Sequence, residues 1–218
     1  MNTLCEMVFI LDRSGSMHGL ESDTIGGFNS MIEAQRKEDI RSLITVALFD
    51  DRLEIPFDRE DLKDIPEMTE RIYFTRGCTA LYDAVGTMIL RVKKHRRGLT
   101  SDEIPGKTVF VITTDGYENA SREFSGAEVR RMIEAQTEAG WEFLYLGANI
   151  DAAAEAEKIG IRAQRAARYH ADPIGVRKNF ETVGRALADF ATTVESEAMC
   201  DSWADDIRAD YKSRSASR

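Results

Sequence analysis

Short apolar runs, separated by stretches with helical periodicity, set the pattern of this chain. The runs cover residues 8–11, 45–49, 109–113 and 143–146. A continuous apolar run rich in β-branched and aromatic residues is typical of a buried strand. Strands that alternate with helices predict a mostly parallel sheet with helices on both faces. The pattern therefore predicts the doubly wound α/β fold class.

Two further segments extend the predicted sheet. Residues 53–57 follow the second run almost at once, and so short a connection permits only an antiparallel hairpin. Pro56 lies within this segment and favours an edge position, because proline cannot donate a hydrogen bond to a neighbouring strand. A short strand is expected at 166–169. The interval 60–76 is polar and irregular, with room for one short helix.

The clearest helical pattern begins at Thr79 and Ala80, and Thr79 is expected to be the N-cap. This helix ends in the basic run 93–97, which suits the last turn of a helix. A later helix is expected at 176–194, where apolar residues recur at alternating spacings of four and three. We expect one domain over residues 1–194 and a helical or flexible tail over 195–218.

Charge and composition narrow the possible partners. The chain has 218 residues, with 29 Lys and Arg against 38 Asp and Glu, which gives a net charge of −9. A chain of this length can form one domain with a well-buried core. Its acidity argues against nucleic acid or an anionic membrane as a partner and favours cations. The sequence leaves the oligomeric state open.

Cysteine usage and hydropathy indicate the compartment. Cys5, Cys78 and Cys200 are widely separated and form neither a zinc motif nor a disulfide framework. The N-terminal residues lack the pattern of a secretory signal. No apolar run approaches the roughly 20 residues that span a bilayer. These features predict that the protein is located in a reducing cytoplasm.

Polar side chains stand where the first and the third apolar runs end. Asp12, Ser14 and Ser16 follow the first run, and Asp115 follows the run 109–113. A buried sheet has no use for such groups at its edge unless something satisfies them. Ligands of doubly wound sheets bind outside the carboxyl ends of the strands, where the strand order reverses. If the two strands are central neighbours, both carboxylates can reach one ion.

Thr79 begins a helix on the same side of the sheet and completes a set of oxygen donors. This set is Asp12, Ser14, Ser16, Thr79 and Asp115. An all-oxygen set favours a hard cation. Its low charge fits Mg²⁺ better than Ca²⁺, with Mn²⁺ or Ca²⁺ as alternatives. Taken one at a time, these residues could equally be loop or helix caps, and Asp50 and Asp51 are expected to be ordinary loop residues.

The three segments that carry these residues resemble the metal-ion-dependent adhesion site of von Willebrand factor type A domains. They are the Asp12-x-Ser14-x-Ser16 stretch, the segment 76–81 around Thr79, and the segment 113–116 around Asp115. The resemblance covers about residues 5–190, and the segment 146–151 is similar to a bacterial stand-alone subgroup. The resemblance to von Willebrand factor type A domains implies a Rossmann-like fold. Cys78 stands where the family commonly has a second glycine, and this change removes no ligand.

The resemblance also implies how the ion is held. The hydroxyls of Ser14, Ser16 and Thr79 would ligate it, and the carboxylates of Asp12 and Asp115 would act directly or through water. A carboxylate from a partner protein would fill the open position. The expected rim of this site consists of Tyr117, Glu118, Asn119 and Asn149.

Three functions are compatible with such a site. The first is a non-catalytic, metal-dependent protein-binding module. The second is a Mg²⁺-dependent phosphohydrolase or phosphotransferase with Asp12 as the nucleophile. Haloacid dehalogenase-type enzymes, however, need a second acid where this chain has Ser14, and no phosphate-binding loop occurs. The third is a structural subunit of a larger complex, with an ion that only orders the loops. The first function is the prediction.

Overall fold

The apolar runs become the central strands of one sheet in the computed structural model, which describes residues 4–38, 40–193 and 198–216. The sheet has six strands in the order β3-β2-β1-β4-β5-β6. In chain order they are β1 (Cys5–Asp12), β2 (Ser42–Phe49), β3 (Leu53–Asp61), β4 (Lys107–Thr114), β5 (Glu142–Ala148) and β6 (Ala166–Tyr169). All neighbouring pairs are parallel except β2 and β3. The predicted doubly wound class with one antiparallel edge strand is confirmed.

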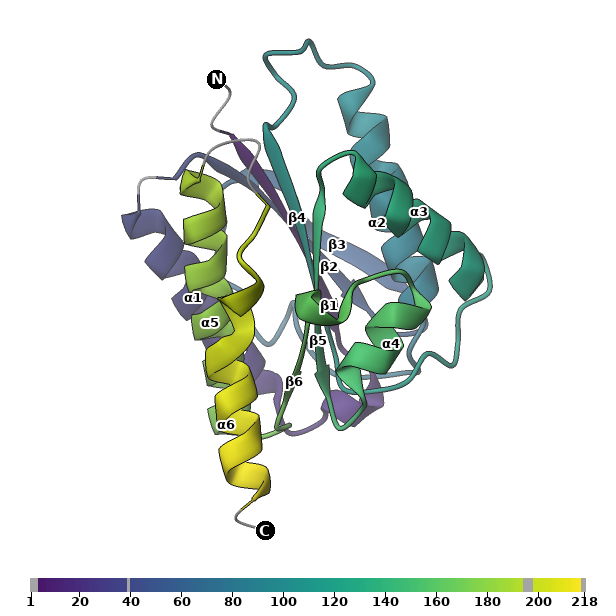
Figure 1. Ribbon diagram of the computed structural model, residues 1–218, viewed down its shortest axis with the longest axis vertical. Coiled ribbons are helices and arrows are strands. Elements are labelled where there is room, and N and C mark those ends of the chain that lie inside the picture. The colour runs from purple at the N-terminus through teal and green to yellow at the C-terminus, as the bar shows by residue number, and fades with distance from the viewer. Residues whose placement is uncertain (1–3, 39, 194–197, 217–218) are drawn as a thin grey trace.

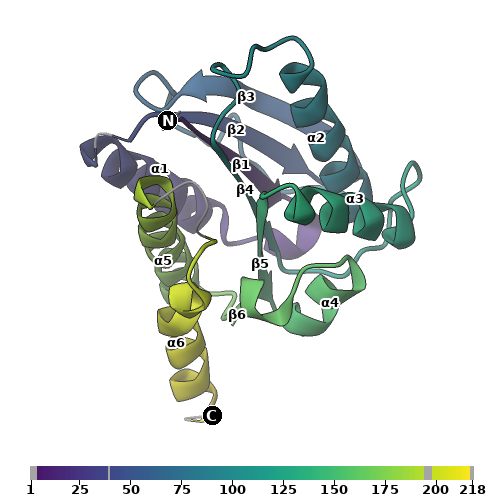
Figure 2. The same cartoon turned by 45° about the horizontal axis from the view of Figure 1, so that its top comes forward.

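Helices cover both faces of the sheet, as Figures 1 and 2 show. On one face lie α1 (Glu21–Lys37), α5 (Pro173–Thr192) and α6 (Asp205–Ser215). On the other lie α2 (Leu81–Arg96), α3 (Gly126–Glu138) and α4 (Ala152–Lys158). None of the described helices is long and apolar enough to cross a membrane.

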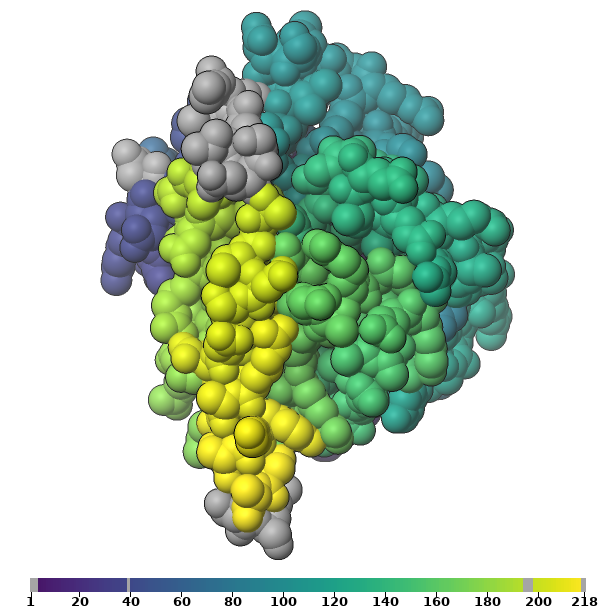
Figure 3. All heavy atoms as spheres, viewed as in Figure 1, coloured from purple at the N-terminus to yellow at the C-terminus, as the bar shows by residue number. Residues whose placement is uncertain are grey.

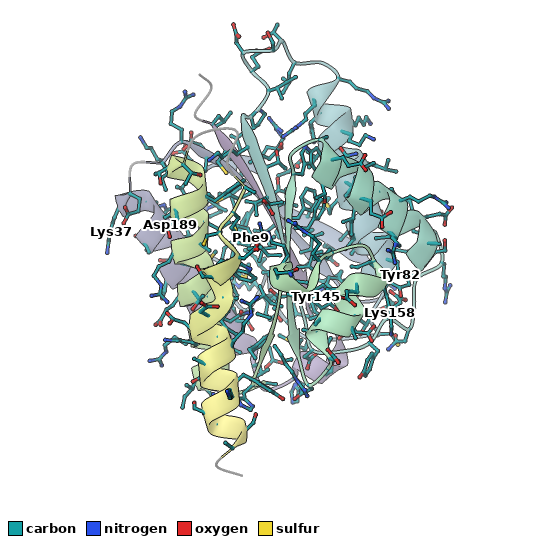
Figure 4. All side chains as sticks on the ribbon, viewed as in Figure 1. Phe9, Lys37, Tyr82, Tyr145, Lys158 and Asp189 are labelled. Atoms are coloured by element: carbon teal, nitrogen blue, oxygen red, sulfur yellow. The ribbon has the colours of Figure 1, made fainter. Side chains whose placement is uncertain are left out.

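Two apolar cores result, one under each helical layer, and β1 contributes to both. Phe9 and Leu11 face the α1 and α5 layer, whereas Val8 and Ile10 face the α2 layer. This alternation follows from the pleat of a strand. Phe28 of α1 packs edge-on against Phe9, with ring centroids 5.5 Å apart. Phe9 and Tyr145 therefore lie inside the body, whereas Lys37 projects from the end of α1 (Figure 4).

The strand order reverses at β1. The chain builds β2 and β3 on one side of β1 and then returns to place β4 on its other side. The register pairs Leu11 of β1 with Thr113 of β4. The carboxyl ends of β1 and β4 therefore lie side by side at the switch point, as the sequence predicts.

The prediction that Thr79 caps the following helix is wrong. Helix α2 begins at Leu81 after Ala80, and no side chain of the N-cap residue accepts a hydrogen bond. Other loops satisfy the free amides instead: the Ala80 amide donates to the Asp50 carbonyl at 2.9 Å, and the Tyr82 amide to Glu118 at 3.0 Å. The Thr79 hydroxyl is therefore not used for capping. The interval 60–76, where one short helix was possible, contains no helix: residues 60 and 61 end β3, and residues 62–76 form turns and irregular backbone.

The C-terminal segment packs on the α1 and α5 layer. Trp203 and Ile207 are buried in the core of that layer, and α6 contacts both α5 and β6. In the space-filling view α6, in yellow, lies directly against α5 (Figure 3). The expected domain boundary between residues 194 and 195 lies outside the described residues.

Candidate metal-binding site

Asp12 is the last residue of β1, and its carboxylate has a fixed orientation. The side chain is buried, with 1% of the residue exposed. Its Oδ1 accepts a hydrogen bond from the Ser14 amide at 2.7 Å, and its Oδ2 accepts one from the Thr114 hydroxyl at 2.6 Å. The first bond closes the loop after β1, and the second reaches the neighbouring strand β4. The carboxylate is thus held between the two central strands.

Two serine hydroxyls continue this cluster towards β4. The loop after β1 forms one short turn of 3-10 helix, Gly15–Met17, which brings Ser14 Oγ and Ser16 Oγ to 3.0 Å from each other. The Ser16 hydroxyl donates to Asp115 Oδ1 at 2.5 Å. Asp115 follows the end of β4, so this contact joins the two strand ends.

Thr79 reaches the cluster from the loop before α2. The residue is buried, and its amide donates to Asn119 Oδ1 at 2.9 Å, while its carbonyl accepts from the Asn119 amide at 3.0 Å. A Cβ atom placed on Gly116 would lie 3.3 Å from the Thr79 hydroxyl oxygen and 3.4 Å from that of Ser16. The two hydroxyls thus flank the same glycine. The structure brings all five predicted donors together at the switch point.

The two carboxylates of the cluster form no ion pair with a cationic side chain in the part of the chain that the structure describes. Burial raises the pKa of Asp12 to about 6, although hydrogen bonds from Thr114 and Ser14 oppose the shift, and the nearby Asp115 adds to it. Burial also raises the pKa of Asp115. Among the described residues, no Lys, Arg or His forms an ion pair with either carboxylate. Buried carboxylates without a cation are costly. The donor set therefore fits a bound divalent cation.

Within the described ranges, no three His, Cys, Asp or Glu side chains cluster in a way that could hold a metal ion. The site at the switch point has only two carboxylates and relies on hydroxyl oxygens for the remainder. Such an all-oxygen donor set suits a hard divalent cation.

The four expected rim residues occupy different positions. Tyr117 is 54% exposed beside the site, and Asn149 is exposed after β5 with a φ of 55°, a conformation that asparagine tolerates. Glu118 instead organises its own loop, because its carboxylate accepts from the amides of Ala120 and Ser121 at 2.9 and 2.7 Å. The Asn119 amide group holds Thr79. Their role as a rim stays a prediction.

Asp50 has a larger part in the site than a loop residue would. It is fully buried, and its Oδ2 accepts from Arg13 Nε at 2.9 Å and from Arg76 Nε at 2.8 Å. The available signal in the sequence was that Arg13 and Asp50 directly follow two predicted parallel strands. Tyr73 was also missed, and its buried hydroxyl donates to the Asp12 carbonyl at 2.6 Å. Cys78 is exposed.

Comparisons with known proteins agree with this architecture. No protein-family model matches the sequence, and no curated protein matches it. Among solved structures, the vWF domain of the type V pili tip protein Mfa5 from Porphyromonas gingivalis is similar, with a TM-score of 0.63 and 10% identity over 90% of this chain and 99% of that one. VWA2, the ArnB paralog from Sulfolobus acidocaldarius, has a TM-score of 0.52 and 18% identity over 87% and 45%.

A third similar structure is the proximal thread matrix protein 1 from the mussel byssus with a zinc-occupied MIDAS motif. Its TM-score is 0.56, with 14% identity over 84% of this chain and 46% of the mussel protein. This chain thus spans about half the length of that protein. The likenesses rest on the same arrangement of a mostly parallel sheet between two helical layers. The chain therefore has the fold of the von Willebrand factor type A domains.

Proposed function

We propose that this chain is a metal-dependent protein-interaction module. The observation that carries the proposal is the short contact between Ser16 and Asp115, within a cluster of hydroxyls and carboxylates that no cationic side chain of the described residues neutralises. The residues proposed to hold the ion are Asp12, Ser14, Ser16, Thr79 and Asp115. A zinc-occupied motif in the structurally similar mussel protein supports a divalent ion at this place in the fold.

Each proposed ligand has a distinct part. The hydroxyl oxygens of Ser14, Ser16 and Thr79 would be neutral ligands, and the carboxylates of Asp12 and Asp115 would balance the charge, directly or through water. Mg²⁺ is the proposed ion, with Mn²⁺ or Ca²⁺ as alternatives, because it prefers oxygen ligands and retains water. When bound, the ion supplies a Lewis-acidic position for an incoming oxygen ligand.

A carboxylate from a protein partner is the proposed occupant of that open position. The chain carries a net charge of −9 and would repel an acidic partner at long range. A cation between the two carboxylate-bearing surfaces removes this repulsion locally, so binding would depend on the metal. We place the protein in the reducing cytoplasm, which is compatible with the free thiols of its three cysteines.

Asp12 is poorly placed for the alternative role of nucleophile in phosphoryl transfer. Only 1% of the residue is exposed, and both of its carboxylate oxygens already accept hydrogen bonds. The residue two positions later, Ser14, is not an acid. These features support a binding module over a phosphotransferase.

Calorimetric titration of the metal-stripped protein with Mn²⁺ and Mg²⁺ tests the proposal. One site is expected, and the double substitution Ser14→Ala/Ser16→Ala should abolish it, whereas Ser30→Ala on the exposed side of α1 should not. An unchanged titration in the double variant would contradict the assigned ligands. Turnover of a phosphoester by the pure protein, abolished by Asp12→Asn, would favour the enzyme instead. Capture of a partner with and without a chelator tests the metal dependence.

A further inference from the structure

Four charged side chains lie beside the proposed metal site and bridge one another: Arg13, Asp50, Glu54 and Arg76, here called the charged quartet. The Nε atoms of both arginines donate to the same oxygen, Asp50 Oδ2, at 2.9 and 2.8 Å. Both arginines also donate to Glu54, at 2.9 Å from Arg13 Nη1 and at 2.5 Å from Arg76 Nη2. Each guanidinium therefore joins the same two carboxylates.

The quartet extends from the interior to the surface. The side chains of Arg13 and Asp50 are fully buried, whereas those of Arg76 and Glu54 are 35% and 50% exposed. The ring of Phe74 lies 5.4 Å from the Arg13 guanidinium carbon and 5.2 Å from that of Arg76, within the range of cation–π contacts. Hydrogen bonds from Arg13 lower the pKa of Glu54 to about 2, so Glu54 carries its negative charge at neutral pH.

Backbone bonds tie the same residues to both hydroxyl-bearing loops. The Arg76 amide donates to the Arg13 carbonyl at 2.8 Å, and the Gly15 amide donates to the Gly77 carbonyl at 3.2 Å. The Asp50 carbonyl accepts from the amide of Ala80, the residue after Thr79, at 2.9 Å. The loop after β1, the end of β2 and the loop before α2 are therefore joined at one point.

The loop before α2 lies close to the end of β2 at Gly77. Gly77 has a φ of 70°, and a Cβ atom there would lie 2.2 Å from Asp51 Oδ1. A residue with a side chain would thus meet both backbone strain and a steric clash. Glycine at this position thus favours the close approach of the Thr79 loop to the end of β2.

We propose that the charged quartet positions the loops that carry the site's hydroxyls and thereby sets the affinity for the divalent ion. This inference rests on the proposed function. Neutral hydroxyls are weak ligands, so their contribution depends on where the surrounding residues hold them. Asp50 and Glu54 also occupy the guanidinium of Arg13, which directly follows Asp12, and so keep this cation away from the Asp12 carboxylate.

If the quartet had a purely structural role, its substitution would leave the Mn²⁺ affinity unchanged. Ion pairs of this kind are weak evidence for stability, since apolar residues often replace them without loss. The Arg91–Asp58 pair, between α2 and β3, offers a matched comparison. Its side chains are 39% and 30% exposed and 2.5 Å apart, and Asp58 lies on the same strand as Glu54. Among the described residues, no hydrogen bond joins this pair to a hydroxyl-bearing loop.

The test uses the two partly exposed members, whose substitution leaves the buried Arg13–Asp50 pair intact. Glu54→Gln and Arg76→Gln are compared with Asp58→Asn for Mn²⁺ affinity, measured by electron paramagnetic resonance. Both quartet variants should bind Mn²⁺ about 10-fold more weakly, in the range typical for residues that orient metal ligands. Arg76→Lys should recover part of the affinity, because an ammonium retains one bond to Asp50. Asp58→Asn should bind as the wild type does.

Amide hydrogen exchange of the metal-free proteins is the second readout. Segments 13–16 and 76–80 should exchange faster in both quartet variants and not in Asp58→Asn. Wild-type Mn²⁺ affinity in the quartet variants, or unchanged exchange of these segments, would overturn the positioning role while leaving the metal site intact. If the wild type binds no Mn²⁺, the proposed function fails, and the exchange data alone decide whether the quartet positions the loops.

Discussion

The Ser16 hydroxyl lies 2.5 Å from the Asp115 carboxylate, although 99 positions separate the two residues in the chain. The contact depends on the parallel pairing of β1 with β4, which places the two strand ends at the same level. It links the loop after one central strand directly to the end of the other. A bound cation would replace this direct hydrogen bond with shared coordination.

Divalent metal should stabilise the wild-type protein against heat. A ligand that binds only the folded state at 100 times its Kd stabilises it by about 2.7 kcal/mol. For a chain of this size that corresponds to a rise in Tm of roughly 5–10 °C. Differential scanning calorimetry with and without Mg²⁺ measures the shift.

Ser16→Ala should remove this Mg²⁺-dependent shift, because it deletes a proposed ligand. It also removes the hydrogen bond to Asp115, so the shift is measured against the metal-free Tm of the same variant. Ser30→Ala, at an exposed position of α1, is the matched control and should retain the full shift. A full shift in Ser16→Ala would mean that the stabilising ion binds elsewhere.

The exposed thiol of Cys78, directly before Thr79, should report metal binding. Mg²⁺ should slow its alkylation by iodoacetamide several-fold, because the bound ion orders the Thr79 loop. Peptide mapping by mass spectrometry follows each cysteine separately. Cys200 is exposed away from the site, so its rate should not change. Cys5 should stay unlabelled, since it is buried and burial raises its pKa to about 12. Equal slowing at Cys78 and Cys200 would indicate a non-specific effect of the ion.

The adjacent glycines of α1 should respond in opposite ways to alanine. A Cβ atom on Gly27 would lie 2.4 Å from Phe180 Cδ2, whereas one on Gly26 would meet nothing within 4 Å. Gly27→Ala should therefore destabilise the fold by about 1–3 kcal/mol through overpacking between α1 and α5. Gly26→Ala should stabilise it by up to about 1 kcal/mol, because alanine favours the helix. Urea denaturation compares the two, and equal effects would mean that α1 and α5 do not pack this closely.

Glu54 should contribute to stability in a pH-dependent manner. Its pKa is lowered from the ordinary 4.5 to about 2, chiefly by hydrogen bonds from Arg13. A depressed carboxyl pKa stabilises the fold above the unfolded-state pKa, and the contribution is lost as the pH falls through the folded-state pKa. The wild type should thus exceed Glu54→Gln in free energy of unfolding at pH 5–7, and the difference should shrink between pH 4.5 and 2. Urea denaturation at several pH values measures the difference in free energy of unfolding between the two proteins. A difference that does not change with pH would exclude the ionised Glu54–Arg13 pair as its source.

Much of the fold could be predicted because its signals are local. The buried strands appear as apolar runs, since a strand covered on both faces tolerates few polar residues. The hairpin of β2 and β3 follows from a connection too short for a parallel crossover, and Pro56 marks β3 as an edge strand. The donors Asp12 and Asp115 stand out because they interrupt these runs.

The remainder depends on partners that no local pattern specifies. Threonine is a residue type that often caps helices, and Thr79 precedes α2. Its amide donates to Asn119, however, and the amide of the next residue donates to Asp50. The Thr79 hydroxyl is therefore left for the site. Arg13 lies within the Asp12-x-Ser14-x-Ser16 motif and could have faced the site, yet its guanidinium binds Asp50, 37 positions away.

The sequence by itself determined the strands, their mostly parallel arrangement and the oxygen-rich character of the site, because burial and donor chemistry are properties of residue type and spacing. Only the tertiary structure decided how the three loops meet. Contacts such as those of Ser16 with Asp115 and of Asp50 with two arginines need strand register and side-chain direction together. Those are set by packing across the whole sheet, and they turn separate polar residues into one site.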